Sequence, residues 1–416
     1  MISDLQKILK ELYSLQRLGI KTGLEHTEML LGACGNPHKK LKCIHVAGTN
    51  GKGSTCAMIF SILREAGVKV GLYTSPHLIH FNERIRVNGI PISDEDIVEF
   101  MDLFYDDIKA IESTFFETTT AMALWYFHRK NVNYAIIETG LGGRLDSTNV
   151  IRPKISVLTR VSMDHREILG EKINNIAREK AGIIKKGTPA ISCIQMNAVR
   201  SVFEEKAKAV GENIQFLKTP DRCSVSLTGT TFIWGDLPYT TSLIGNHQAV
   251  NASLAIKAVR SLNFNITQTT INRGLKKAAW PGRFQVLSFR PPIVYDVAHN
   301  ADGINCALNT IKVLFNRKPV GLIALKEDKE LELITPSLKD QFEKIWTIDD
   351  DNDLLIGAID LSDRLKENDI DAQPISHLKD FTSSANIEIP GLVFGSHYIA
   401  KNVFKHFHFF FDNGFI

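Results

Sequence analysis

Short apolar runs alternate with longer amphipathic stretches along most of the chain. In the first half the apolar runs predict five strands, at Cys43–Val46, Lys69–Tyr73, Tyr134–Glu138, Ile155–Thr159 and Pro189–Cys193. The stretches around them carry apolar residues at helical spacing. They predict helices at Asp4–Arg17, Ser54–Ala66, Asp94 to about Glu112 with Ser93 as N-cap, and Thr118–Arg129. This alternation is typical of a parallel sheet covered by helices.

The pattern changes in the second half of the chain. Polar and apolar residues alternate over Cys223–Trp234 around Gly229, which predicts a hairpin, and helices are expected at about His247–Leu262 and Thr269–Ala278. The helix breakers in the segment 280–283 then interrupt the helical pattern. We therefore expect a domain boundary here, between a first domain of residues 1–280 and a second of residues 281–416.

The second domain is expected to be a smaller parallel α/β domain. Its strands are predicted at Phe284–Leu287, Ile293–Asp296, Val320–Ala324, Lys344–Ile348 and Gly391–Gly395, with helices between them. The aromatic tail His406–Phe411 is too short to span a bilayer and is interpreted as a final buried strand.

Composition narrows the class of protein. The 416 residues suggest two or three domains, and 44% hydrophobic with 23% charged residues is ordinary for a globular protein. A net charge of +3 gives no reason to expect nucleic acid or an anionic membrane as a partner. The six cysteines form no metal-binding spacing, and the first residues do not resemble a signal peptide. We expect a cytoplasmic, monomeric protein that acts on small molecules.

A glycine-rich turn after the first strand is the most informative motif. Gly48, Gly51 and Gly53 allow the backbone to approach a polyphosphate, and the helix that follows directs the positive end of its dipole at the same point. Lys52 is suited to the terminal phosphates, and Ser54 or Thr55 to magnesium. Only two residues separate Gly48 from Gly51, fewer than in the usual P-loop. The alternative is a plain glycine-rich surface turn.

Polar side chains follow several other strands of the first domain. Ser75 and Glu138 follow two of them, and His165 comes a few residues after a third. Ligands of such sheets bind at the carboxyl ends of the strands. The Ser75 hydroxyl and the Glu138 carboxylate could therefore join phosphate oxygens around magnesium. Taken singly, Glu138 is more simply explained as a solvated rim residue or a salt-bridge partner, His165 as a hydrogen-bonded structural histidine, and Lys180 in EKAGIIK as a surface lysine paired with a glutamate.

The order of motifs resembles a known family. GTNGKGS, SPH with FNERI, ETGLGGRLDSTN, DHREILG, EKAGIIK, GNHQAVNASLA, WPGRF and DVAHN follow one another along the chain. They closely resemble the folylpolyglutamate synthase and dihydrofolate synthase family of the Mur-ligase superfamily, in its bacterial bifunctional form, which uses the same short phosphate loop. The resemblance is loosest past residue 328. The family often has proline after DVAHN, where this chain has Ala301-Asp302, and Arg166 stands beside His165.

The resemblance implies a P-loop nucleotide-binding domain with a parallel sheet, followed by a smaller Rossmann-like α/β domain that binds glutamate and closes on ATP. It implies ATP as co-substrate, two magnesium ions and potassium as a further candidate ion. The implied catalytic residues are Lys52, His165, His299 and Lys180, the last as a carbamate. The implied ATP contacts are Asn50, Gly51, Lys52, Gly53, Ser54, Asn251, Arg283 and Asp296, and the implied metal ligands are Ser75, Glu138 and His165.

Substrate residues are implied in the same way. The pterin-bearing substrate is expected near Thr22, Phe116, Glu117, Leu145, Asp146 and Ser147, and glutamate near His299 and Ser396. The implied reaction joins L-glutamate to dihydropteroate and to tetrahydrofolates through an acyl phosphate. The alternatives are a monofunctional folylpolyglutamate synthase, a peptidoglycan Mur ligase and, from another class, a P-loop ATPase switch.

Overall fold

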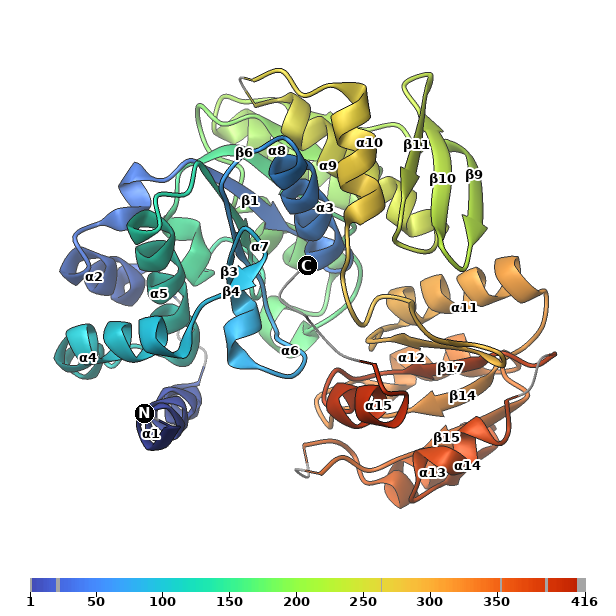
Figure 1. Cartoon of the computed structure of the whole chain (residues 1–416). Coiled ribbons are helices and arrows are strands. Elements are labelled where there is room, and N and C mark those ends of the chain that lie inside the picture. Colours follow the sequence, from blue (N-terminus) through green and yellow to red (C-terminus); the bar gives the residue numbers. More distant parts are fainter. Residues whose placement is uncertain (1, 20–22, 263, 352–353, 386–387, 410–416) are drawn as a thin grey trace.

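The chain folds into two lobes, each built on its own sheet (Figure 1). The computed structural model describes residues 2–19, 23–262, 264–351, 354–385 and 388–409. We call the eight-stranded sheet with its helices the large lobe, and the six-stranded sheet with its helices the small lobe. The predicted α/β fold class is confirmed.

The sheet of the large lobe has the strand order β4-β3-β2-β5-β1-β6-β7-β8. From β2 to β8 all neighbours are parallel, whereas β3 and β4 pair antiparallel at one edge. The strands are β1 (Cys43–Ala47), β2 (Val70–Tyr73), β3 (Ile85–Val87), β4 (Ile90–Pro91), β5 (Tyr134–Glu138), β6 (Pro153–Leu158), β7 (Ala190–Ser192) and β8 (Ile214–Phe216). All five strands predicted for this half are confirmed within one or two residues.

Helices cover both faces of this sheet because both faces of its central strands are apolar. Along β1, Ile44 and Val46 pack into a core with α3, α9 and α10, while Cys43 and Ala47 face the opposite side. Ser93 caps α4 as predicted, by accepting from the Asp96 N–H group. The α-helices are α1 (Ile2–Ser14), α2 (Glu25–Ala33), α3 (Lys52–Glu65), α4 (Asp94–Ile111), α5 (Phe115–Arg129), α6 (Arg166–Leu169), α7 (Ile173–Ala181), α8 (Asn197–Ala209), α9 (Asn246–Arg260) and α10 (Gln268–Lys277).

Shorter elements complete the large lobe. The predicted hairpin is present, and a third strand extends it into an antiparallel sheet of order β11-β10-β9 that contacts α11 of the small lobe. Its strands are β9 (Asp221–Ser226), β10 (Gly229–Trp234) and β11 (Leu237–Thr241). The single-turn helices are η1 (Leu15–Leu18), η2 (Pro37–Lys40), η3 (Phe81–Arg84) and η4 (Ser147–Val150).

The sheet of the small lobe has the order β12-β13-β17-β14-β15-β16. Its strands are β12 (Gln285–Phe289), β13 (Pro292–Asp296), β14 (Val320–Ile323), β15 (Lys344–Thr347), β16 (Ala372–Pro374) and β17 (Gly391–Phe394). Helices α11, α12 and α13 pack on one face, and α14 and α15 on the other. These helices are α11 (Ala301–Phe315), α12 (Leu331–Leu338), α13 (Ala358–Lys366), α14 (Leu378–Thr382) and α15 (Ala400–His406).

Two expectations about the second domain are wrong. Its sheet is not entirely parallel, because β12 reaches β13 through a tight connection and pairs with it antiparallel. The aromatic tail does not form a final strand over its described part, because α15 continues to His406 and packs Val403 and Phe404 into the core at helical spacing. Residues 410 and 411 of that predicted strand lie outside the described residues. The domain limit between residues 280 and 281 stays a prediction.

No helix in the described part of the chain combines the length and apolar character needed to cross a bilayer.

Candidate active site

A cavity of about 390 Å³ opens where the carboxyl ends of the large sheet face the small lobe. Loops after β1, β2, β5 and β6 line it from one side, and the segments at 283 and 296–306 line it from the other. All of the predicted catalytic, ATP and metal residues meet here: Asn50, Gly51, Lys52, Gly53, Ser54, Ser75, Glu138, His165, Lys180, Asn251, Arg283, Asp296 and His299.

The phosphate loop joins β1 to the first turn of α3. Gly51 is the N-cap with a φ of 87°, and an added Cβ atom there would overlap the Asn251 side chain. Gly53 lies against the Trp280 indole, so a side chain there would also collide. Lys52 begins the helix two residues earlier than predicted and donates from Nζ to the Thr49 carbonyl at 3.3 Å. The loop thus leaves a helix N-terminus and an ammonium group facing the cavity, which suits a polyphosphate.

Glu138 ends the central strand β5 and is 4% exposed. Burial raises the pKa of its carboxyl, while the charge of Lys52, the Ser75 N–H group and the charge of Arg283 act in the opposite direction. The Ser75 N–H group donates to Glu138 Oε2 at 3.3 Å. A buried carboxylate that lines the cavity is inconsistent with the solvated rim residue considered as the alternative.

Lys180 on α7 is also buried, at 4% exposure. Its Nζ atom donates to the Gly48 carbonyl at 3.0 Å. Burial and then the charge of Lys52 lower its pKa to about 7. The alternative of a surface lysine paired with a glutamate is therefore wrong, since the neighbouring Glu179 pairs instead with Arg144 at 2.8 Å.

His165 lies between the two lobes at the start of α6. It has a φ of 51°, an unfavourable conformation for a residue with a side chain, and its side chain is 38% exposed. Burial lowers its pKa to about 4, although Asp164 opposes that shift, so the imidazole is neutral at physiological pH. A neutral ring nitrogen is the form that can ligate a metal.

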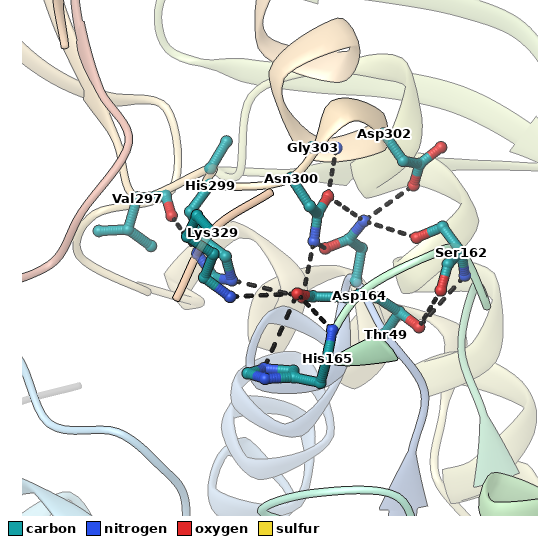
Figure 2. A network of polar contacts seen from close by, with 12 residues as sticks. Thr49, Ser162, Asp164, His165, Val297, His299, Asn300, Asp302, Gly303 and Lys329 are labelled. Carbon is teal, nitrogen blue, oxygen red and sulfur yellow. Dashed lines mark hydrogen bonds and ion pairs between the residues drawn. The ribbon is translucent and has the colours of Figure 1, made fainter. Parts of the chain in front are cut away.

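The carboxylate of Asp164 accepts from the main-chain N–H group of His165 in its own lobe and contacts three side chains of the small lobe (Figure 2). Asn300 Nδ2 donates to its Oδ2 atom at 3.0 Å, Lys329 Nζ lies 3.1 Å from Oδ1, and His299 Nε2 lies 3.4 Å from Oδ2. Burial would raise the pKa of Asp164, but hydrogen bonding and charge from His299, together with the charge of Lys329, hold it well below its usual range. The carboxylate is therefore ionised and links the lobes.

The small lobe contributes Arg283 and Asp296 at the start of its sheet. Asp296 ends β13, and its two oxygens accept from the N–H groups of Phe284 and Ala298, each at 2.9 Å. Burial raises the pKa of this carboxyl, opposed first by the charge of Arg283. His299 Nδ1 lies 3.0 Å from the Val297 carbonyl, so that Nδ1–H donates there. Asp296 thus braces the loop that presents Arg283.

The predicted substrate residues do not line this cavity. Asp146 accepts from the Leu141 N–H group at 2.8 Å, and Phe116 packs against Gly140, so both lie directly behind a loop that does. Glu117 is 3% exposed and accepts from the Thr114 N–H group in a capping box. Outside the lining are Phe116, Glu117, Leu145, Asp146, Ser147 and Ser396, and Thr22 lies outside the described residues.

The hydroxyl of Ser396 forms a hydrogen bond within its own loop. Its Oγ atom accepts from the Tyr398 N–H group at 3.1 Å, and its carbonyl accepts from the Tyr295 hydroxyl at 2.7 Å. It is 4% exposed. In this structure it is not presented to the cavity with His299.

Sequence reasoning missed several residues at the cavity. Arg160 and Asp164 follow β6. Residues 217–219 follow β8, a strand of three residues that is too short to be predicted. Position after a strand was the available signal for Arg160 and Asp164. Asp302 opens α11 next to the DVAHN motif, and its partner Arg160 lies 2.8 Å away on the large lobe. No local pattern indicates that pairing.

Comparisons with known proteins agree with this geometry. A family model for the Mur ligase middle domain matches residues 46–259. Dihydrofolate synthase/folylpolyglutamate synthase of Bacillus subtilis is 41% identical over 345 residues, which cover 75% of this chain and 77% of that protein. The crystal structure of folylpolyglutamate synthase from Thermotoga maritima is 32% identical with a TM-score of 0.83, covering 97% of this chain and 96% of that one.

A second solved structure carries ligands. Escherichia coli FolC in complex with DHPP and ADP is 29% identical with a TM-score of 0.84, covering 96% of this chain and 97% of that one. The sequence match to the Bacillus subtilis protein covers 75% of this chain, and the two structural matches cover 97% and 96% of it. The chain belongs to the dihydrofolate synthase/folylpolyglutamate synthase family of ligases.

Proposed function

We propose that this chain joins L-glutamate to dihydropteroate and adds further glutamates to tetrahydrofolates, using ATP. The observation that carries the proposal is the meeting of the Lys52 helix terminus, the buried Glu138 carboxylate and Arg283 of the small lobe in one cavity. ADP bound to FolC, a relative of the same fold, supports nucleotide as the ligand of this cavity.

The chemistry follows from the inertness of a carboxylate. An amine does not attack a carboxylate, because a charged oxygen is a poor leaving group. In the proposed reaction a carboxylate oxygen of the acceptor attacks the γ-phosphorus of ATP, and the bond from that phosphorus to ADP breaks. The glutamate amine then attacks the acyl carbon and loses a proton, and inorganic phosphate leaves with the former carboxylate oxygen. No protein nucleophile takes part.

Residues of both lobes have roles in this scheme. Lys52 and the N–H groups at the start of α3 hold the phosphates, and Arg283 stabilises the negative charge spread over the moving phosphoryl group. Asp296 accepts from the Phe284 N–H group and so orients the Arg283 loop. Asn251 of α9 lines the same cavity and is a further proposed contact to the nucleotide. Closure of the lobes would exclude water from the acyl phosphate.

The residues fit magnesium bound together with nucleotide. Among the described residues no cluster of three or more acidic, histidine or cysteine side chains could hold a metal alone. Magnesium commonly takes one or two protein oxygens and completes its shell with phosphate oxygens and water, as Ser75 and Glu138 beside the phosphate loop allow. Bound there, magnesium would neutralise phosphate charge during transfer. His165 is the third proposed ligand.

Lys180 is proposed to act as a carbamate. Only a neutral amine reacts with carbon dioxide, and a pKa of about 7 leaves a large neutral fraction at physiological pH. The resulting anion would lie beside the carbonyl of Gly48 and could serve a second magnesium ion.

Substrate placement completes the proposal. His299 contacts glutamate from the small lobe, and the pterin lies near the loop 140–142, backed by Phe116 and Asp146. The chain is divided at residue 280 into a nucleotide domain with the pterin site and a domain that binds glutamate.

The test is product analysis by mass spectrometry. Dihydropteroate and tetrahydrofolate are incubated separately with ATP and isotope-labelled glutamate, and both are expected to gain a glutamyl residue. Product from tetrahydrofolate alone would indicate a monofunctional enzyme. ATP hydrolysis without either acceptor, and with no glutamylated product, would contradict the ligase and favour the ATPase switch.

A further inference from the structure

A reciprocal pair of carboxamides joins the two lobes beside the cavity. Asn50 Nδ2 donates to Asn300 Oδ1 at 3.1 Å, and Asn300 Nδ2 donates to Asn50 Oδ1 at 3.2 Å. Asn50 belongs to the phosphate loop, whereas Asn300 is the N-cap of α11 and is 6% exposed. Asn300 Oδ1 also accepts from the Gly303 N–H group at 2.9 Å, which fixes the orientation of its amide.

The donors of Asn50 are all engaged with protein acceptors. Besides Asn300, its Nδ2 atom lies 3.1 Å from Ser162 Oγ and 2.9 Å from Asp302 Oδ2. Its main-chain N–H group donates to the Arg160 carbonyl at 3.2 Å. The phosphates are therefore left to Lys52 and the N–H groups at the start of α3. Asn50 acts in this arrangement as a link between the lobes.

Asn300 also reaches the loop that carries His165. Its Nδ2 atom donates to Asp164 Oδ2 at 3.0 Å, and Asp164 Oδ1 in turn accepts from the His165 N–H group at 3.0 Å (Figure 2). One buried amide of the small lobe therefore contacts both the phosphate loop and the carboxylate that supports a proposed metal ligand. Glycines give the phosphate loop conformational freedom, and the other loop adopts a φ of 51° at His165, so external contacts are needed to hold one geometry.

We propose that Asn300 is a positioning residue that sets the phosphate loop through Asn50 and the His165 loop through Asp164. It does not touch substrate. It holds the loops in the geometry for phosphoryl transfer only while the small lobe is docked, so transfer is coupled to closure. The effect on catalysis rests on the proposed function, while the effect on the phosphate loop does not.

The test uses a serine substitution at position 300. Asn300→Ser keeps an oxygen that can cap α11 but removes the amide that reaches Asn50 and Asp164. The matched control is Asn305→Ser on the same helix, where Asn305 Nδ2 donates to Ser337 Oγ at 3.0 Å within the small lobe. Hydrogen–deuterium exchange of the segment 48–55 without ligand, kcat and the affinity for ADP are measured for each variant.

We expect Asn300→Ser to speed exchange in the segment 48–55 and to lower kcat about tenfold or more, because small misplacements of reacting groups are costly. ADP affinity should fall much less than kcat, since Lys52 and the helix terminus remain. Asn305→Ser should match the wild type in all three. Unchanged exchange or unchanged kcat in Asn300→Ser would each overturn the inference.

A double-mutant cycle with Asn50→Ala separates positioning from independent contributions. If the residues act through their mutual contact, the double variant should lose no more kcat than the worse single variant. Losses that multiply would contradict the inference. If the wild-type protein formed no glutamylated product, the proposed function would fail, and the exchange measurement would then decide the inference alone.

Discussion

The Nζ atom of Lys180 lies 3.0 Å from the carbonyl oxygen of Gly48, at the base of the phosphate loop. Lys180 is 4% exposed, and burial followed by the charge of Lys52 lowers the pKa of its amine to about 7. Burial disfavours a charged ammonium at this position and so favours the neutral amine, which is the form that reacts with carbon dioxide. This relationship gives the first prediction.

Carbamate on Lys180 should increase with pH. Because only the neutral amine reacts, and its fraction rises as pH passes through about 7, occupancy should be low near pH 6 and high near pH 8. Isotope-labelled bicarbonate and carbon NMR at neutral to mildly alkaline pH would detect it. Lys180→Met should remove the signal, and its persistence in that variant would assign the carbamate to another lysine.

Lys52→Ala should abolish turnover while the protein stays folded. Its ammonium faces the cavity and, within the described part of the chain, donates to the Thr49 carbonyl alone, so its removal leaves the core intact. Activity is expected to fall by a factor on the order of 10³ with little change in melting temperature. Lys208→Ala, at an exposed position on α8, is the control. Full activity of Lys52→Ala would refute the assignment of the loop.

Glu138→Gln should raise the magnesium concentration needed for half-maximal activity. The substitution keeps the size of a side chain that is 4% exposed but removes the charge that attracts the ion. A magnesium titration of the rate would measure the change, with Glu204→Gln on the exposed face of α8 as control. An identical magnesium dependence in the Glu138 variant would exclude it as a ligand.

Ile136→Ala should destabilise the large lobe. Ile136 is fully buried in the core between β5 and α3, so its truncation leaves a cavity and should cost about 3 kcal/mol. Ile90→Ala is the control, because that side chain is 62% exposed. Urea unfolding followed by circular dichroism would compare the two. Equal stability of both variants would mean that the core relaxes around the lost atoms.

Much of the fold could be predicted from local patterns. The buried parallel strands β1, β2, β5, β6 and β7 are encoded within a few residues, as in the apolar run at Cys43–Ala47, and so is the Ser93 cap of α4. The β12 segment is predicted as a strand, but its antiparallel direction, which follows from the tight connection to β13, is not. The aromatic tail is predicted as a strand, whereas its first residue, His406, ends α15, and the position of that helix depends on the core that Val403 and Phe404 enter.

Some residues of the candidate site could also be predicted from local sequence, and others could not. The phosphate loop and Glu138 follow strands and were predictable from that position. The burial of Lys180 and the pairing of Asn50 with Asn300 arise only when segments far apart in sequence meet. The predicted roles of Glu117, Asp146 and Ser396 came from resemblance alone, and in the structure these side chains hold their own loops. The monomeric state and the cytoplasmic location stay predictions.

The central claim is that a carboxylate is activated by phosphoryl transfer in the cavity between the lobes. Dihydropteroate labelled with heavy oxygen in its carboxylate, incubated with ATP and glutamate, tests it directly by mass spectrometry of the released phosphate. The acyl phosphate route predicts one heavy oxygen in each inorganic phosphate formed with product. Phosphate without the label, released in step with glutamylated product, would contradict the account.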